Sequence, residues 1–162
     1  MYYGEAVTKL DDKGRITVPR RIRETMDHEG HLIWYMARGY NHSIFLFHRD
    51  EWNKIRQQAG RHSAMDAKTL PFRRMFFSSV AEARPDGQGR MAVPQHLREY
   101  AGIDKEAVLI GVEDHLELWD KDAWRQFQES NDAEYEDMAA PLFSMGESVA
   151  AATAKGGPED EC

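Results

Sequence analysis

The chain has little cysteine and no long apolar stretch, and both absences narrow its possible functions. Cys162, the last of the 162 residues, is the only cysteine, which excludes an internal disulfide and a cysteine-based zinc site. No apolar run approaches the roughly 20 residues that a membrane-spanning helix needs. Residues 1–5 do not resemble the start of a signal peptide, so we expect a cytoplasmic protein.

Enzyme motifs are also missing. The sequence contains no Walker loop, no dinucleotide-binding fingerprint and no nucleophile elbow. His28 and His31 are separated by two residues, but the other histidines are scattered and no zinc pattern can be assembled from them. We therefore expect a protein that is not an enzyme and that uses no metal, cofactor or small-molecule substrate.

The chain lacks an overall basic surplus, which argues at first against a nucleic-acid partner. Its formal net charge is −7, but residues 130–162 alone hold eight acids and one lysine, a net of −7. Residues 1–80 carry fourteen bases and nine acids, a net of +5. Because the charge is segregated along the chain, the first half remains suited to binding a polyanion.

The sequence repeats itself. Residues 10–24, LDDKGRITVPRRIRE, align with residues 85–99, PDGQGRMAVPQHLRE, and seven of the fifteen positions are identical. Further along, residues 44–52 resemble residues 116–124 with an offset of 72 instead of 75. Two related modules with a shorter connection in the second copy explain both alignments.

Each copy is predicted to contain a short strand, a turn, a second short strand, a helix, a β-hairpin and a closing helix. Gly14 and Gly89 supply a permissive backbone in the turns, and Pro19 and Pro94 are expected at the first helical position. The expected boundaries are residues 4–50 for the first module, 51–78 for connecting helices, 79–122 for the second module, 123–130 for a closing helix and 131–162 for a disordered acidic tail.

Some finer expectations concern helix ends. Asp50 and Asp120 are plausible N-caps of the helices that close the two copies. Residues 65–77 are expected to form a helix that Pro71 interrupts.

The four tryptophans are expected to pack in the core or at a subunit interface rather than to stack on single-stranded bases: Trp34, Trp52, Trp119 and Trp124.

An Asp-x-x-x-Arg turn occurs once in each copy, as Asp11 with Arg15 and as Asp86 with Arg90. A guanidinium can grip a phosphate or contact the guanine O6 and N7 acceptors in the major groove, and an aspartate four residues earlier can orient it. A single motif of this kind is most often an exposed ion pair. Its duplication within an aligned block favours a functional module, with four neighbouring candidates for phosphate contacts: Lys13, Arg20, Arg21 and Arg23.

These motifs resemble those of the MraZ family, within the AbrB/SpoVT/MazE superfamily of swapped-hairpin DNA-binding domains. The resemblance covers about residues 1–130, and the paired motifs at this separation are highly specific. It rests on Gly4-Glu5, residues 10–15, Val18-Pro19, the segment Phe-Arg-Arg-Met-Phe-Phe at 72–77, residues 86–90, Val93-Pro94 and residues 97–102.

The resemblance implies an α+β fold with a mainly β core, in which two tandem swapped-hairpin modules form one pseudo-two-fold double module with flanking helices. It further implies a regulator, most simply an autorepressor, of the bacterial division and cell-wall gene cluster. Such proteins form rings, associate with the nucleoid and bind G-rich direct repeats in the double-stranded DNA upstream of their own operon. By this resemblance Arg15 and Arg90 are the DNA-contacting arginines.

The two copies differ in their cations. Lys13 is replaced by glutamine in the second copy, as is Arg20, and Arg21 is replaced by histidine. We therefore predict that Arg15 and its neighbours supply more of the DNA affinity than Arg90 does.

The main alternative is an antitoxin-like module that wraps a toxin with its acidic tail. Proteins of that kind usually carry one hairpin module followed directly by the tail. Two modules and the connecting segment 72–77 favour a regulator.

Overall fold

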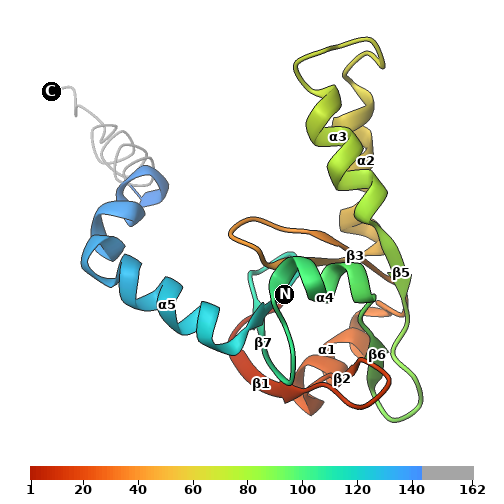
Figure 1. The fold of residues 1–162 in the computed structure, drawn as a ribbon, viewed down its shortest axis with the longest axis vertical. Helices are drawn as coiled ribbons and strands as arrows, with labels where there is room; N and C mark the ends of the chain where they lie inside the picture. Colours follow the sequence, from red (N-terminus) through yellow and green to blue (C-terminus); the bar gives the residue numbers. More distant parts are fainter. Residues whose placement is uncertain (144–162) are drawn as a thin grey trace, which may run out of the picture. The chain divides into compact units, whose positions relative to one another are not determined.

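The computed structural model describes residues 1–143 (Figure 1). The chain divides into two compact units, Met1–Trp124 and Arg125–Cys162. The first unit contains both sequence repeats. It is built on two antiparallel sheets, one of six strands and one of two.

The strand order of the larger sheet is β1-β7-β8-β4-β3-β5. Its strands come from both copies: β1 (Glu5–Lys9), β3 (Trp34–Arg38), β4 (Ile44–His48), β5 (Ala81–Ala83), β7 (Glu106–Gly111) and β8 (Leu116–Asp120). The smaller sheet pairs β2 (Arg15–Thr17) with β6 (Arg90–Ala92). We call this pair the β2–β6 ribbon.

The two copies exchange strands. The first strand of each copy pairs with the hairpin of the other, so that β1 lies on β7 and β5 lies on β3. The strands of the ribbon and the second hairpin strands, β4 and β8, pair with their own counterparts. The sheet order is therefore unchanged when the copies are interchanged. This arrangement confirms the predicted swapped-hairpin double module with its pseudo-two-fold relation.

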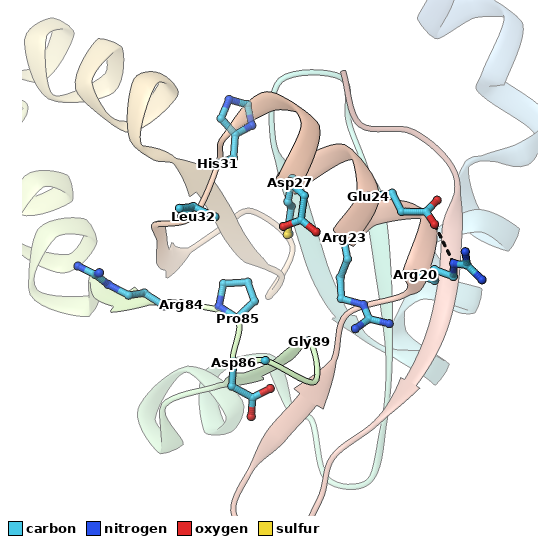
Figure 2. A pocket seen from close by; sticks show the side chains of 12 residues that line it. Arg20, Arg23, Glu24, Asp27, His31, Leu32, Arg84, Pro85, Asp86 and Gly89 are labelled. Atoms are coloured by element: carbon cyan, nitrogen blue, oxygen red, sulfur yellow. Dashed lines mark hydrogen bonds and ion pairs between the residues drawn. The ribbon is translucent and has the colours of Figure 1, made fainter.

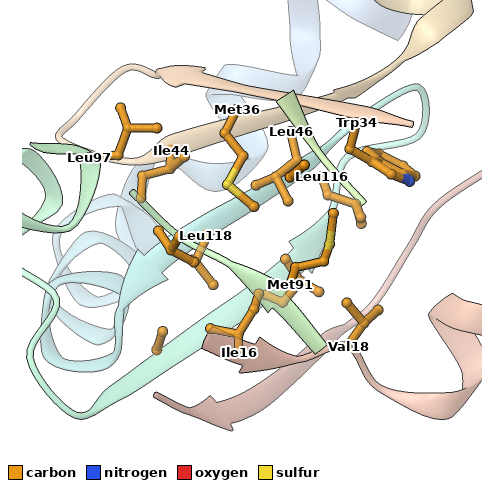
Figure 3. Close-up of a cluster of buried hydrophobic side chains, with 14 of the residues drawn as sticks. Ile16, Val18, Trp34, Met36, Ile44, Leu46, Met91, Leu97, Leu116 and Leu118 are labelled. Carbon is orange, nitrogen blue, oxygen red and sulfur yellow. The ribbon is translucent and has the colours of Figure 1, made fainter. Parts of the chain in front are cut away.

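One hydrophobic core serves both copies. Ile16 and Met91, which face each other across the ribbon, are fully buried. They pack in a single cluster with side chains of the six-stranded sheet, as Figure 3 shows for Trp34, Met36, Ile44, Leu46, Leu116 and Leu118. Burying a side chain of this size contributes roughly 1.5–3 kcal/mol. Since each copy supplies only part of the cluster, neither can be expected to fold alone.

Helices α1 (Arg20–Glu29) and α4 (Gln95–Ala101) follow the ribbon strands in the two copies. Each buries an apolar pair four residues apart, as predicted: Ile22 with Met26 and Leu97 with Ala101. Each also ends at a glycine in the left-handed conformation, which satisfies the last carbonyls. Pro19 and Pro94 have extended ψ angles and occupy the N-cap position, one residue before the first helical position expected for them.

Helices α2 (Arg49–Gly60) and α3 (Leu70–Ser79) lie side by side and enclose a second apolar cluster around Trp52 and Phe76 (Figure 1). Two helix-end expectations are wrong here. Pro71 lies in the first turn of α3 and starts the helix instead of interrupting it, because its missing N–H has no partner there in any case. Asp50 lies inside the first turn of α2, after the N-cap His48.

The second unit is helical where it is described. Helix α5 (Lys121–Asn131) begins in the first unit, and its start is capped by Asp120, whose carboxylate accepts the Ala123 N–H at 3.0 Å. A short 3-10 helix (Asp132–Glu134) follows, and residues 135–143 are helical. The expected disorder is thus wrong for residues 131–143, because alanine, glutamate and methionine favour helix even in an acidic segment. Residues 144–162 lie outside the described part.

Three of the tryptophans pack as expected. Trp34, Trp52 and Trp119 are buried, and Trp124 is partly buried. Among residues 1–143, no helix has the length and apolar character to cross a membrane.

Candidate nucleic-acid interface

The aspartate of each Asp-x-x-x-Arg turn organises the turn as well as the arginine. In the first turn, Asp11 Oδ1 accepts the backbone N–H of Lys13 at 3.0 Å and of Arg15 at 2.9 Å, and Oδ2 accepts Arg15 Nε at 2.7 Å. Hydrogen bonds from the Arg15 backbone and side chain lower the pKa of Asp11. The carboxylate therefore stays charged and keeps the arginine in one orientation.

The second turn has the same geometry. Asp86 Oδ1 accepts the backbone N–H groups of Gln88 and Arg90, each at 2.9 Å, and Oδ2 accepts Arg90 Nε at 2.8 Å. The pKa of Asp86 is lowered for the same reason, with the Arg90 backbone hydrogen bond as the largest cause. In both turns the arginine side chain donates to the aspartate through Nε alone. The aspartate therefore does not occupy the two terminal nitrogens of the guanidinium group.

The turn glycines are needed for conformation and for space. Gly14 and Gly89 have φ angles of +71° and +74°. A Cβ on Gly14 would lie 2.8 Å from Arg98 Cζ, and one on Gly89 would lie 2.2 Å from Arg23 Cδ. Each turn is thus packed under an arginine from the helix of the other copy.

Backbone bonds also join each turn to the other copy. The Gly89 carbonyl accepts the Val18 N–H at 2.8 Å, and the Gly14 carbonyl accepts the Val93 N–H at 3.0 Å. The strand exchange therefore determines the position of both motifs.

Arg15 and Arg90 lie on the same face of the β2–β6 ribbon. Arg15 is opposite Ala92, and Arg90 is opposite Thr17. Between these pairs Ile16 and Met91 point into the core, so the two arginines emerge on the opposite face, beside the exposed Thr17 and Ala92. Their side chains are 25% and 34% exposed, which leaves both accessible to a ligand. The sequence-predicted pair is brought together on one surface.

The four neighbouring cations are placed differently from one another. Lys13 is exposed in the first turn. Arg20 is highly exposed and forms an ion pair with Glu24 at 2.7 Å. Arg21 donates to the Tyr3 carbonyl and lies 4.4 Å above the Tyr3 ring, which ties it to the N-terminal segment. An exposed ion pair such as that of Arg20 is worth little and can be given up for another anion.

Arg20 and Arg23 of the first copy lie beside the turn of the second copy. They line a cavity of about 550 Å³ together with Arg84, Asp86 and Gly89 (Figure 2). Arg23 Nε is buried without a hydrogen-bond partner in the part of the chain that the structure describes. The strand exchange brings α1 to the turn of the second copy, so these two cations are neighbours of the Arg90 turn as well as members of the first copy.

Sequence reasoning did not single out Arg84 and Arg98 as site residues. Arg84 lines the same cavity as Arg23, and Arg98 packs on Gly14 and donates to the Val93 carbonyl at 3.1 Å. The identity of Arg23 and Arg98 in the repeat alignment was an available signal for an equivalent structural role.

Comparison with known proteins agrees with the two-module architecture. A family model described as "MraZ protein", and in the same description as antitoxin-like, matches residues 1–74 and 76–145. A protein named "Transcriptional regulator MraZ", from Syntrophomonas wolfei subsp. wolfei (strain DSM 2245B / Goettingen), is 37% identical over 146 residues. The alignment covers 90% of this chain and 99% of that protein. The chain therefore belongs to the MraZ family.

Proposed function

We propose that this chain is a sequence-specific DNA-binding transcriptional regulator and that Arg15 and Arg90 contact the DNA. The observation that carries the proposal is the presence of both arginines, each oriented by an aspartate, on one exposed face of the β2–β6 ribbon. The name of the similar S. wolfei protein supports the same class of function. The family is one of transcriptional regulators and not of enzymes.

The ribbon has suitable dimensions for this role. A two-stranded ribbon fits the major groove, which is about 12 Å wide. Diagonal neighbours across such a ribbon are about 7–8 Å apart, and successive bases on one strand are separated by about 3.4 Å along the axis. Arg15 and Arg90 can therefore address base pairs about two steps apart, or the phosphates that flank them.

The surrounding cations differ in how readily they can bind phosphate. Lys13 and Arg20 are exposed at the two turns and are the best candidates for direct phosphate contacts. Arg21 and Arg23 are also proposed to support binding, but both have packing roles against Tyr3 and Gly89. The aspartates and turn glycines, Asp11, Asp86, Gly14 and Gly89, orient the contacts.

At a finer level, we infer an autorepressor of the division and cell-wall gene cluster that binds G-rich direct repeats upstream of its own operon. A ring of protomers would match such repeats and increase avidity. Exposed aromatic side chains on α3 and the β3–β4 turn support self-association, with Tyr40 66% and Phe72 54% exposed. They border an apolar cavity of about 370 Å³ beside α2 and α3. A cytoplasmic, nucleoid-associated location follows from this function.

A mobility-shift assay with DNA from upstream of the protein's own gene tests the DNA proposal. We expect a specific shift that is absent with scrambled DNA and that weakens steeply as salt rises, because bound cations displace counterions. The double substitution Arg15→Ala with Arg90→Ala should abolish the shift while leaving the circular dichroism spectrum unchanged. Failure of the folded wild-type protein to bind at low salt would overturn the proposal.

The second candidate function is an antitoxin-like interaction module. The description of the matched family as antitoxin-like supports this candidate. The gene neighbourhood separates the two candidates. A methyltransferase gene and division genes downstream fit a regulator. An adjacent small toxin gene, whose product binds this chain more tightly than DNA does, would favour the antitoxin.

A further inference from the structure

A cluster of potential metal ligands lies away from the ribbon face. His31 follows the end of α1, His48 ends β4, and Asp50 lies in the first turn of α2. One ligand atom from each residue lies within 4.8 Å of the other two. None of the histidine spacings in the sequence indicates a metal site. It is the fold that brings these three residues together.

The two histidine rings are held close and nearly parallel. Their centroids are 3.7 Å apart and their planes differ by 5°. Within the described part of the chain, His48 Nδ1 is buried and has no hydrogen-bond partner. The Trp34 and Tyr2 rings pack around this pair and limit its contact with solvent. A buried imidazole nitrogen without a partner is unfavourable unless another group binds it.

His31 is oriented by groups on its other side. Its Nδ1 lies 2.7 Å from the Tyr2 hydroxyl and 3.4 Å from Glu29 Oε2. Glu29 in turn binds the N-terminal amine at 2.8 Å. Metal-binding histidines usually have such a partner on the second ring nitrogen, which leaves Nε2 for the metal.

The second copy provides an internal comparison. Gly30 and Gly102 end the equivalent helices in the same left-handed conformation, so Ile103 takes the place of His31. Ile103 is buried, and in the aligned hairpins Asp120 takes the place of His48. The fold therefore tolerates an apolar residue at the first position and does not require stacked histidines.

We propose that His31, His48 and Asp50 bind a divalent transition-metal ion, and that Zn²⁺ is the best match. Two imidazoles and one carboxylate are typical zinc ligands, and a tetrahedral ion leaves a fourth position for water. Zinc–nitrogen distances of about 2.0–2.1 Å, with the ion close to both ring planes, require the near-parallel rings to rotate substantially away from the stacked arrangement. Glu29 and Arg49 line the adjoining cavity of about 210 Å³, where Glu29 holds His31 Nδ1 and the N-terminal amine.

A bound ion would connect three segments of the first unit. It would join the end of α1 to the start of α2. Through His31 and Tyr2 it would also support the N-terminal residues, which pair with the second copy at Glu113. The ion is thus expected to stabilise the double module without contacting the ribbon face.

The test uses metal-free full-length protein that carries Cys162→Ser, so that the terminal thiol cannot bind metal. Titration with Co²⁺, followed by visible absorption, and with Zn²⁺, followed by calorimetry, should each show a single ion per chain. Excess Zn²⁺, at about 100 times its Kd, should raise the Tm by about 5 °C or more.

Three variants locate the ion. His48→Gln and Asp50→Asn should each weaken Zn²⁺ binding at least about tenfold and remove the Tm increase. Asp50 is exposed, so its variant remains informative if His48→Gln does not fold. The control, His28→Gln, changes an exposed histidine of α1 outside the cluster and should bind as the parent does. Absence of binding by the parent, or equal binding by Asp50→Asn and His28→Gln, would overturn the proposal.

Discussion

The two Asp-x-x-x-Arg turns are nearly identical internally but have different surroundings. In both, the aspartate accepts two backbone N–H groups and the Nε of the arginine. The first turn keeps Lys13 and lies under Arg98, whereas the second lies beside Arg20 and Arg23. A turn's charge environment is therefore decided largely by the partner copy, because the copies exchange strands.

This arrangement changes the expected asymmetry between the turns. The sequence comparison assigned all the extra cations to Arg15, but Arg20 and Arg23 lie beside the turn of Arg90. The cations are thus shared between the two turns. The greater contribution of Arg15 to DNA affinity therefore stays a prediction, which substitutions in the two turns can test.

The largest effect is expected from removing the arginines. Arg15→Ala and Arg90→Ala should each weaken operator binding by about 1–3 kcal/mol, or roughly 5- to 150-fold. Quantitative mobility shifts at fixed salt measure both. Equal losses would show that the shared cations balance the two turns. A loss at least about tenfold greater for Arg15 would restore the asymmetry inferred from sequence.

Next in size is the stability cost of filling the turn glycines. Gly14→Ala and Gly89→Ala combine a positive φ with a clash and should each cost about 1–3 kcal/mol, measured by chemical denaturation. Gly89→Ala should cost more, because its Cβ would meet Arg23 at a shorter distance than the Gly14 Cβ meets Arg98. Gly87→Ala is the matched control, since open space surrounds that position. Equal stability of all three variants would contradict the packing of turns under arginines.

A smaller effect should reveal which turn Arg20 serves. Arg20→Gln and Lys13→Gln should each reduce the salt dependence of binding by about one unit of slope. In double-mutant cycles for DNA affinity, Arg20 should couple to Arg90 by at least about 0.5 kcal/mol and Lys13 to Arg15 by a similar amount. Coupling of Arg20 to Arg15 alone would show that the exchanged arrangement does not govern DNA binding. Lys68→Gln, on the exposed connection between α2 and α3, is the control.

The smallest effect concerns pH. The folded pKa of Asp11 and of Asp86 is lowered from 3.8, so their charged forms stabilise the fold above that value. This contribution is lost as pH falls below 3.8 through the lowered pKa values. Thermal unfolding between about pH 5 and pH 2 should show a smaller Tm decrease in Asp11→Asn and Asp86→Asn than in the wild type. Equal Tm decreases in the two variants would support equivalent turns. If the Tm of the wild type did not fall over this pH range, the two carboxylates would not contribute to stability.

Much of the local structure could be predicted from periodicity and turn chemistry. The spacing of Ile22 and Met26 indicated the buried face of α1, and Asp120 was correctly identified as a cap. Errors arose where one residue type suits two positions. Pro71 starts α3 instead of breaking a helix, and Asp50 lies within a helix that His48 caps. Propensity alone does not distinguish such alternatives.

The repeat and the turn chemistry are both local, so the two modules, each with an aspartate-held arginine, can be recognised from the amino-acid sequence. The groups that surround each turn, by contrast, depend on how the two copies pack together. Strand exchange carries Arg23 to Gly89 and Arg98 to Gly14. The contact between His31 and His48 also depends on the tertiary structure, because it requires α1 and β4 to pack on the shared core. Such long-range proximity leaves no periodic signal in the chain.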